Sequence, residues 1–255
     1  FHGPYLCRKG QCLFPAPLVL LKANEQFTRL APSDKLTESD LGRVALPNKK
    51  NAQLLGAKPL EQIWLTPEGW QATLRGDTPR ADHMVPIDDL LDKEERLGIG
   101  RNHATRTTGD GLLYQTQHIR PKADIAIGLH VNGLDAQTPL PASGLVRLGA
   151  EGRLAHWQRS ALPTLPPPPA INSQRLLVVL VTHARFERGW LPDGFEPATV
   201  AHRSGKDQTV WRGQINGVAL RLISAVVGKP VREGGWDLLS QAPRPMHALV
   251  PAASC

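Results

Sequence analysis

Prolines and glycines recur along the whole chain, and they limit the length of any regular helix. The sequence holds 23 of each among its 255 residues, which is about 9% each, where proteins use about 5% proline and about 7% glycine. Proline removes a backbone donor and glycine destabilises helix interiors, so both favour turns and irregular connections. The excess predicts a β-rich or α+β protein, long enough for one large or two small domains.

The chain carries a basic excess. Its formal net charge is +7 and its pI is about 9.6, which favours an anionic partner such as nucleic acid, acidic lipid or acidic protein. A solvated basic surface is the alternative. No apolar run approaches the roughly 18 residues that cross a bilayer, and no signal-peptide pattern opens the chain. We expect a cytoplasmic protein without a membrane partner. We also expect that the sequence, which begins at Phe1, starts inside the fold.

Local signals in the first half predict a few short elements. Two apolar runs around residues 8–11 predict an opening hairpin that carries Cys7 and Cys12 as free thiols. Thr66, Pro67 and Gly76 have the positions of a helix N-cap, first helical residue and stop. Residues 20–58 show no clean period and read as irregular, and residues 87–96 read as a second helix or a solvated loop.

Alternating apolar residues predict strands further along the chain. Residues 97–100 and 112–119 predict a hairpin whose long polar tip spans residues 101–111, and residues 125–131 predict a half-buried strand. Short strands at 145–148 and 153–157 flank a turn. Buried strands are expected at 176–182 and, as strand or helix, at 218–227, and residues 246–250 close the chain.

A proline-rich run divides the chain. Residues 162–169 read L-P-T-L-P-P-P-P, which predicts a stiff, extended spacer. We therefore expect an N-terminal domain over residues 1–161 without its first elements, a linker over 162–174 and a C-terminal portion over 175–255.

Three groups of motifs in the sequence resemble the motifs of a known protein family. Residues 96–114 read R-L-G-I-G-R-N-H-A-T-R-T-T-G-D-G-L-L-Y, residues 148–153 read L-G-A-E-G-R, and residues 234–237 read G-G-W-D, followed by P-R-P at 243–245 and V-P-A-A-S at 250–254. In order and spacing they resemble the third-subunit family of the Cmr (type III-B CRISPR) complex, in the RAMP superfamily. Departures are Asn102 in place of an acid and Ala150 and Ala253 in place of glycines.

The resemblance implies a fold, a role and partners. The fold would be two ferredoxin-like (RRM-related) RAMP folds with a projecting β-hairpin and glycine-containing loops. The role would be to hold the 5′ tag of the CRISPR RNA in antiviral defence, next to the large polymerase-like subunit and the first backbone RAMP subunit. Target RNA would be met at most indirectly, and neither catalysis, cofactor nor metal is implied.

The polar stretch between the two apolar runs predicts a positive finger. Cations there can reach phosphates, and hydroxyls can donate to phosphates or 2′-OH groups of unstacked RNA. A basic, solvated hairpin is the alternative. The candidate RNA-binding residues of the finger and its borders are Arg101, Asn102, His103, Thr105, Arg106, Thr107, Arg120 and Lys122.

Two further segments supply candidates. A tight glycine turn that ends in a cation can cradle a phosphate in its backbone, or it can be a plain β-turn. A tryptophan in the terminal motif can stack on a base or belong to a core, and the cations before it can line an RNA groove or face water. These candidates are Gly149, Gly152, Arg153, Lys229, Arg232 and Trp236.

Two rival functions remain. The first is a RAMP endoribonuclease that processes precursor CRISPR RNA with a histidine acid or base, although no spacing organises the nine histidines. The second is a protein-docking module without direct RNA contact. The sequence predicts no catalytic residue and no metal ligand set.

Overall fold

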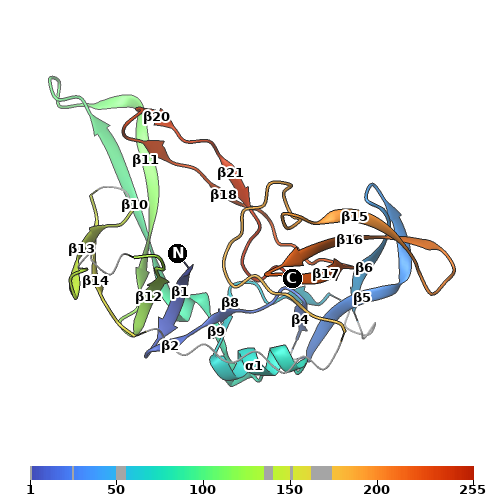
Figure 1. The fold of residues 1–255 in the computed structure, drawn as a ribbon. Helices are drawn as coiled ribbons and strands as arrows, with labels where there is room; N and C mark the ends of the chain where they lie inside the picture. Colours follow the sequence, from blue (N-terminus) through green and yellow to red (C-terminus); the bar gives the residue numbers. More distant parts are fainter. Residues whose placement is uncertain (1, 25, 50–55, 135–139, 150–151, 162–173) are drawn as a thin grey trace.

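Strands make up nearly all of the regular structure in the described part of the chain, and one α-helix interrupts them (Figure 1). The structure, a computed structural model, describes residues 2–24, 26–49, 56–134, 140–149, 152–161 and 174–255. The described strands form small sheets of two to four strands. The predicted α+β class therefore holds with a small helical share.

Two three-stranded sheets form the N-terminal end. The first has the order β12-β1-β2, and the second has the order β3-β8-β9. Both the predicted opening hairpin and the strand expected near residue 125 are confirmed. The strands are β1 (His2–Arg8), β2 (Gln11–Cys12), β12 (Ile125–His130), β3 (Phe14–Pro15), β8 (Ile63–Leu65) and β9 (Met84–Pro86).

The first core lies between these sheets and helix α1 (Pro67–Arg75). The ring centroids of Phe14 and Trp70 are 4.9 Å apart and stacked. Cys7 and Cys12 are buried free thiols, as expected, with their sulfurs 3.5 Å apart across the β1–β2 pair.

Helix α1 begins and ends where the sequence predicts. The Thr66 hydroxyl accepts a hydrogen bond from the Gly69 N–H at 3.3 Å, which satisfies one of the free donors of the first turn. Gly76 ends the helix at φ +93°, a left-handed conformation that glycine adopts without steric cost.

The irregular conformation predicted for residues 20–58 is wrong. The structure has a four-stranded sheet there in the order β6-β5-β4-β7. Pro32 and Pro47 and the register shift between Pro32 and Leu36 interrupt the alternation that marks a strand, so its period is hidden in the sequence. The strands are β4 (Leu20–Ala23), β5 (Gln26–Ser39), β6 (Gly42–Lys49) and β7 (Lys58–Pro59).

The helix or loop predicted for residues 87–96 is also wrong. A short 3₁₀ turn occupies Ile87–Asp89, and strand β10 (Leu91–Arg101) follows. Its partner is β11 (Thr108–Pro121), which pairs with it from Leu91 onwards. Glu94 of β10 forms an ion pair with Arg120 of β11, and Asp92 lies 3.8 Å from Lys122, which directly follows β11. Cross-strand pairing therefore explains a composition that resembled a solvated segment.

The second half is built from hairpins. A three-stranded sheet has the order β15-β16-β17, and three strand pairs join β13 with β14, β18 with β21 and β19 with β20. The two strands predicted around the 148–153 turn are confirmed. The strands are β13 (Ser143–Arg147), β14 (Leu154–Gln158), β15 (Glu196–Ala201), β16 (Asp207–Ile215), β17 (Val218–Leu222), β18 (Val231–Glu233), β19 (Trp236–Asp237), β20 (Ala242–Pro243) and β21 (His247–Leu249).

The buried strand predicted at residues 176–182 is wrong. Leu176 and Val178 are 48% and 49% exposed, and the segment has no strand pairing. Val179 and Val181 pack against the first core, and the Leu180 N–H donates to the Ser254 carbonyl at 2.9 Å. Isolated contacts with the C-terminal residues therefore take the place of the regular strand pairing that was predicted. Residues 218–227 form a strand only as far as Leu222.

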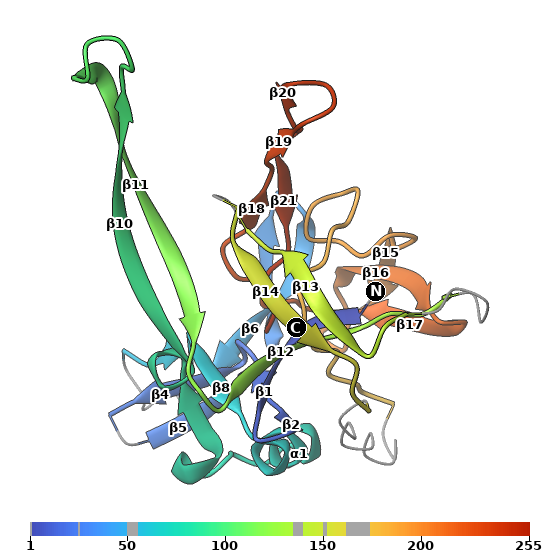
Figure 2. The same cartoon turned by 90° about the vertical axis from the view of Figure 1, so that its left-hand side faces the viewer.

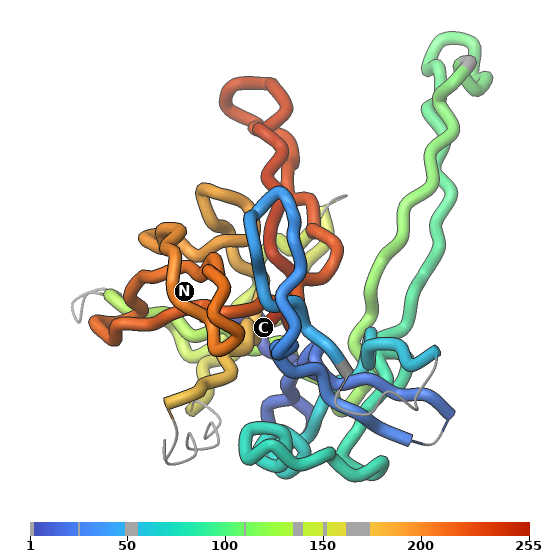
Figure 3. Tube along the Cα trace, turned by 90° about the vertical axis from the view of Figure 1, so that its right-hand side faces the viewer, coloured from blue at the N-terminus to red at the C-terminus, as the bar shows by residue number. Residues whose placement is uncertain are grey.

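The C-terminal portion shares a core with the N-terminal part. Val44 of β6 packs with Leu191, Phe195 and Trp211, and the rings of Trp190 and Trp211 meet edge to face at 5.1 Å. The proline-rich spacer falls on residues 162–173, outside the described residues, so the domain boundaries stay a prediction. Two hairpins leave this body: Figures 2 and 3 show the β10–β11 pair and the β18–β21 pair projecting to the same side.

Candidate RNA interface

The longest projection is the predicted hairpin, here confirmed and longer than expected. Strands β10 and β11 pair in register from Leu91 opposite Pro121 to Ile99 opposite Leu113, and Arg101 lies opposite Thr108 after a register shift. At about 3.3 Å per residue the ribbon is about 30 Å long. Its turn is shorter than the predicted tip, because residues 108–111 belong to β11.

Asn102 organises the turn at the end of this ribbon. Its side-chain oxygen accepts hydrogen bonds from the N–H groups of Ala104 at 2.9 Å and Thr105 at 3.3 Å. Its backbone bonds to Thr107 and Arg106 at 2.9 and 2.8 Å close the loop. Where the family pattern has an acid, the amide here supplies the same acceptor without a negative charge.

The tip presents cations and hydroxyls to solvent. Arg101, His103 and Arg106 are exposed, and the Thr105 and Thr107 hydroxyls lie 2.8 Å apart. One of the two hydroxyls donates a hydrogen bond to the other, so the hydrogen of the accepting hydroxyl is available to an acceptor on a partner molecule. The structure thus brings all six predicted tip residues together on one turn, although their RNA contacts stay a prediction.

The cations predicted to border the tip lie at the other end of the ribbon. Arg120 forms an ion pair with Glu94, and Lys122 lies 3.8 Å from Asp92. Arg120 is twelve positions along β11 from Thr108, the tip end of the strand, which is about 40 Å at about 3.3 Å per residue. These two cations are therefore partly neutralised and cannot share a single nucleotide with the tip.

Glu94 is the centre of a basic cluster at the base of the ribbon. Desolvation opposes its charged form, but the hydrogen bond from Arg96 and the charges of Arg120 and Arg96 outweigh it and lower the pKa of Glu94. The charge of Arg153 acts in the same direction. Arg153, from the glycine turn, therefore lies within electrostatic range of Glu94, an association that the sequence alone did not predict.

The glycine turn before Arg153 joins β13 to β14. The Leu148 N–H donates to the Arg153 carbonyl at 3.1 Å, and Gly149 and Gly152 have φ of +88° and +67°. Left-handed backbone explains both glycines. No atom lies within 4 Å of a Cβ placed on either, so both turn positions are open to solvent. Ala150 lies outside the described residues.

The remaining candidates belong to the second projection. Lys229 and Arg232 are exposed, and neither forms an ion pair within the described residues. Trp236 lies opposite Pro243 on the β19–β20 pair and is 53% exposed. The alternative of a core tryptophan is therefore wrong, because more than half of this residue is exposed to solvent.

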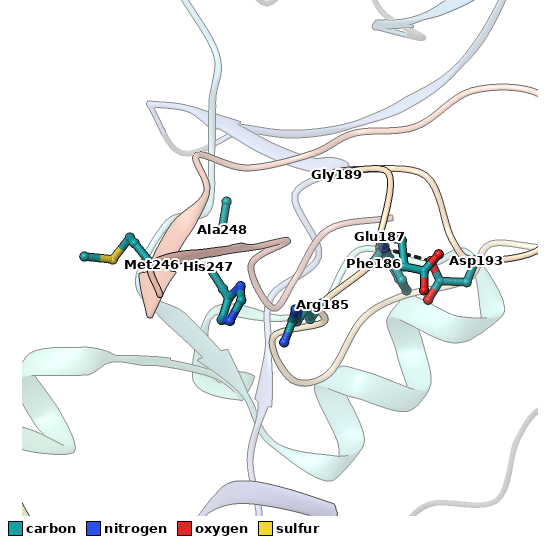
Figure 4. Close-up of a pocket in the computed structure, with 8 residues that line it drawn as sticks. All are labelled: Arg185, Phe186, Glu187, Gly189, Asp193, Met246, His247 and Ala248. Atoms are coloured by element: carbon teal, nitrogen blue, oxygen red, sulfur yellow. Dashed lines mark hydrogen bonds between the residues drawn. The ribbon is translucent and has the colours of Figure 1, made fainter. Parts of the chain in front are cut away.

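A pocket at the base of the second projection was missed from the sequence. Its volume is about 520 Å³, and Figure 4 shows Arg185 and His247 pointing into it from separate segments. Two backbone hydrogen bonds between Ala184 and Val250, at 2.9 and 2.8 Å, hold those segments together. The residues lie far apart in the sequence, and no motif connects them. The lining residues are Arg185, Phe186, Glu187, Gly189, Asp193, Met246, His247 and Ala248.

The histidines considered for catalysis do not converge on one site. His103 is at the tip, His118 shares a hydrogen bond with Thr116, and His183 accepts from the Ala252 N–H at 2.9 Å. His202 lies 2.9 Å from the Ser204 hydroxyl, and His130 and His156 lie on strands β12 and β14. Within the described ranges, no three His, Cys, Asp or Glu side chains are grouped to hold a metal ion. The one described helix is too short and polar to cross a membrane.

A family comparison gives the class of the chain. The sequence profile described as "CRISPR-associated protein (Cas_Cmr3)" matches residues 1–255. The chain therefore belongs to this family, and its predicted membership among the third subunits of type III-B CRISPR complexes is confirmed. None of the curated proteins compared matches the chain.

Two solved structures resemble the chain at low identity. One is a cryo-EM structure of the Type III-B Cmr-beta bound to cognate target RNA, with 13% identity, a TM-score of 0.46 and coverage of 99% of this chain. The other is the same assembly bound to cognate target RNA and AMPPnP, with 12% identity, a TM-score of 0.45 and the same coverage. The chain spans 63% and 64% of the length of those two chains.

Proposed function

We propose that this protein is a non-catalytic, guide-binding subunit of a cytoplasmic type III-B interference complex. In this role it holds the 5′ tag of the CRISPR RNA and contacts the large polymerase-like subunit and a backbone RAMP subunit. Target RNA is reached only through the guide. The two ferredoxin-like folds implied by the family remain part of this proposal.

The tip of the β10–β11 ribbon is the observation that carries the proposal. Two exposed arginines and two hydroxyls sit on a turn fixed by hydrogen bonds to Asn102. The ribbon carries this turn about 30 Å from the body, so its conformation serves no core. A fixed, cationic turn in this position fits the phosphates and unstacked bases of single-stranded RNA.

The cluster around Glu94 supports a second contact along the same strand. Arg96 and Arg120 pair with the Glu94 carboxylate, and the charge of Arg153 also acts on it, so these four groups together carry a positive charge. Arg153 follows Gly152, and a Cβ on Gly149 or Gly152 would meet no atom within 4 Å, so these two backbone positions are open to a phosphate. A backbone that follows the ribbon from base to tip would meet both sites.

Exposed apolar side chains favour protein contact as well. Leu97, Ile99 and Leu113 share one face of the ribbon by register and are 71%, 55% and 61% exposed. A two-stranded ribbon with both faces in water is marginally stable. A docking module without RNA contact therefore remains the second candidate, and retention of RNA separates the two.

The test is a reconstituted complex loaded with guide RNA, with or without its 5′ tag. Arg101→Ala/Arg106→Ala should weaken retention of tagged guide and leave untagged guide nearly unaffected. Arg212→Ala/Arg221→Ala removes two exposed arginines that face each other on β16 and β17, and it serves as the matched control. Equal retention by both double variants would exclude the tip as the RNA contact.

A further inference from the structure

The end of the second projection, residues 234–246, presents an exposed apolar turn that we call the hook. Leu238 and Leu239 at its end are 77% and 97% exposed, and Trp236 and Met246 along its sides are 53% and 66% exposed. Figure 2 shows this segment, with β19 and β20, standing clear of the body at the end of the β18–β21 pair. Large apolar side chains gathered at a protruding turn indicate an interaction surface.

Hydrogen bonds within the turn hold the two leucines outward. The Asp237 carboxylate accepts from the N–H groups of Leu239 at 2.8 Å and Ser240 at 3.3 Å. The Gln241 side-chain amide donates to the Leu238 carbonyl at 2.8 Å. The turn is therefore ordered before it meets a partner, which lowers the entropy lost on binding.

The neck of the hook is closed by its own backbone. The Arg244 N–H donates to the Gly235 carbonyl at 2.8 Å, and Gly235 has φ +144°. A Cβ on Gly234 would lie 3.2 Å from the Met246 sulfur, so the absence of a side chain there lets Met246 lie across the ribbon. These contacts extend the apolar surface from the leucines toward the neck.

The charges around the hook indicate what it meets. Lys229, Arg232 and Arg244 are exposed and form no ion pair within the described residues. The Asp237 carboxylate accepts from the N–H groups of Leu239 and Ser240, which lower its pKa most, and the more distant charge of Arg244 acts in the same direction. Glu233 is the remaining acid on the ribbon. The free charge is therefore positive, behind an apolar end.

This combination fits a protein groove better than RNA. Trp236 on the side of the hook has a planar face for base stacking, but Leu238 and Leu239, the most exposed side chains at its end, have none. The polar side chains of the turn are occupied within it. We propose that the hook inserts Leu238 and Leu239 into an apolar groove on a neighbouring subunit, and that carboxylates on the rim of that groove face Arg232 and Arg244. The assignment to a subunit of the same complex rests on the proposed function.

The test measures binding of the full chain to its two proposed neighbours, each purified without RNA. Leu238→Ser/Leu239→Ser should weaken binding to one neighbour at least tenfold, and Arg232→Glu/Arg244→Glu should weaken the same complex and reduce its salt dependence. Leu145→Ser/Leu154→Ser, at two leucines that are 66% and 61% exposed on β13 and β14, is the matched control and should bind normally. Guide retention should be unchanged in the leucine variants.

Each other outcome is decisive. If the wild-type chain binds its neighbours and the hook variant binds them equally, the hook proposal fails while the proposed function stands. If the hook variant loses guide RNA and keeps both neighbours, the hook contacts RNA instead. If the wild-type chain binds neither neighbour, the proposed function and the docking role fail together.

Discussion

The guanidinium of Arg101 donates a hydrogen bond from Nε to the carbonyl oxygen of Arg106, 3.1 Å away. This bond crosses the turn at the end of the β10–β11 ribbon, where Arg106 has φ +58°. Arg101 therefore contributes a positive charge and also a hydrogen bond across the turn, which we call the brace, whereas the Arg106 side chain contributes only charge. The two arginines of the tip should respond differently to substitution.

We expect Arg106→Ala to weaken retention of tagged guide RNA with little change in stability, because exposed substitutions usually cost within about 0.5 kcal/mol. Arg101→Ala should weaken it further, since the turn also loses its brace. Hydrogen exchange at residues 102–107 should then rise for Arg101→Ala alone. Equal exchange in both variants would show that the brace is unimportant.

Substitutions of Asn102 can separate the effect of its hydrogen-bond acceptor on RNA binding from the effect of a negative charge at the same position. Asn102→Asp keeps the acceptor for the Ala104 and Thr105 N–H groups but adds a negative charge beside the predicted phosphate path. Charges about 4 Å apart in water interact by about 1 kcal/mol, so RNA should bind more weakly by about that amount at low salt. The deficit should shrink at high salt through screening. Asn102→Ala should instead loosen the turn, and a deficit in Asn102→Asp that is independent of salt would contradict the electrostatic explanation.

Elements with local signals were predictable, and elements set by distant pairing were not. Helix α1 was found because Thr66, Pro67 and Gly76 mark its ends within one segment. The sheet at residues 20–58 was missed because Pro32 and Pro47 interrupt its period. The start of β10 was missed because the acids Asp92 and Glu94 meet their cations only after the chain returns through β11.

The residues of the candidate site divide in the same way, into those that a local stretch of sequence predicted and those that only distant pairing brings together. The six tip residues lie within the single stretch 101–107, so its polar composition between two apolar strands was enough to group them. The association of Arg153 with Glu94 depends on two different hairpins, and the pocket with Arg185 and His247 depends on two segments joined by backbone pairing. No spacing rule in a single sequence records such contacts.

Alkaline pH should destabilise the protein through the thiols of Cys12, which is buried, and Cys255, which is half-buried. Burial raises the pKa of Cys12 to about 12 and that of Cys255 to about 11, whereas free thiols titrate near 8.5. The folded state binds these protons more tightly, so their contribution is complete below about pH 8.5 and is lost as the pH rises toward 11 to 12. Denaturation midpoints measured from pH 7 to 10.5 should fall, and they should fall less steeply in Cys12→Ala/Cys255→Ala. Parallel slopes would exclude the thiols as the cause.

Purified protein should not cleave RNA. The described histidines are dispersed over the tip, strands and loops, so no pair is placed as general acid and base. Labelled precursor CRISPR RNA incubated with and without Mg²⁺ should stay intact. A discrete product that a single His→Ala substitution abolishes would assign the chain to the endoribonucleases.

RNA binding should depend steeply on salt, and the two ends of the ribbon should contribute unequally. Arg101 and Arg106 are exposed and form no ion pair within the described residues, whereas Arg120 is paired with Glu94. If four cations neutralise phosphates, log K should fall against log salt with a slope near −3, at about −0.7 per contact on single strands. Arg106→Ala should reduce the slope by about 0.7, and Arg120→Ala should reduce it less, because Glu94 already neutralises part of that charge.

The measurement is a filter-binding titration from low to high salt, with tagged and untagged guide. A flat response in the wild-type chain would mean that the charge excess serves an acidic protein neighbour, and the docking module would then become the leading function.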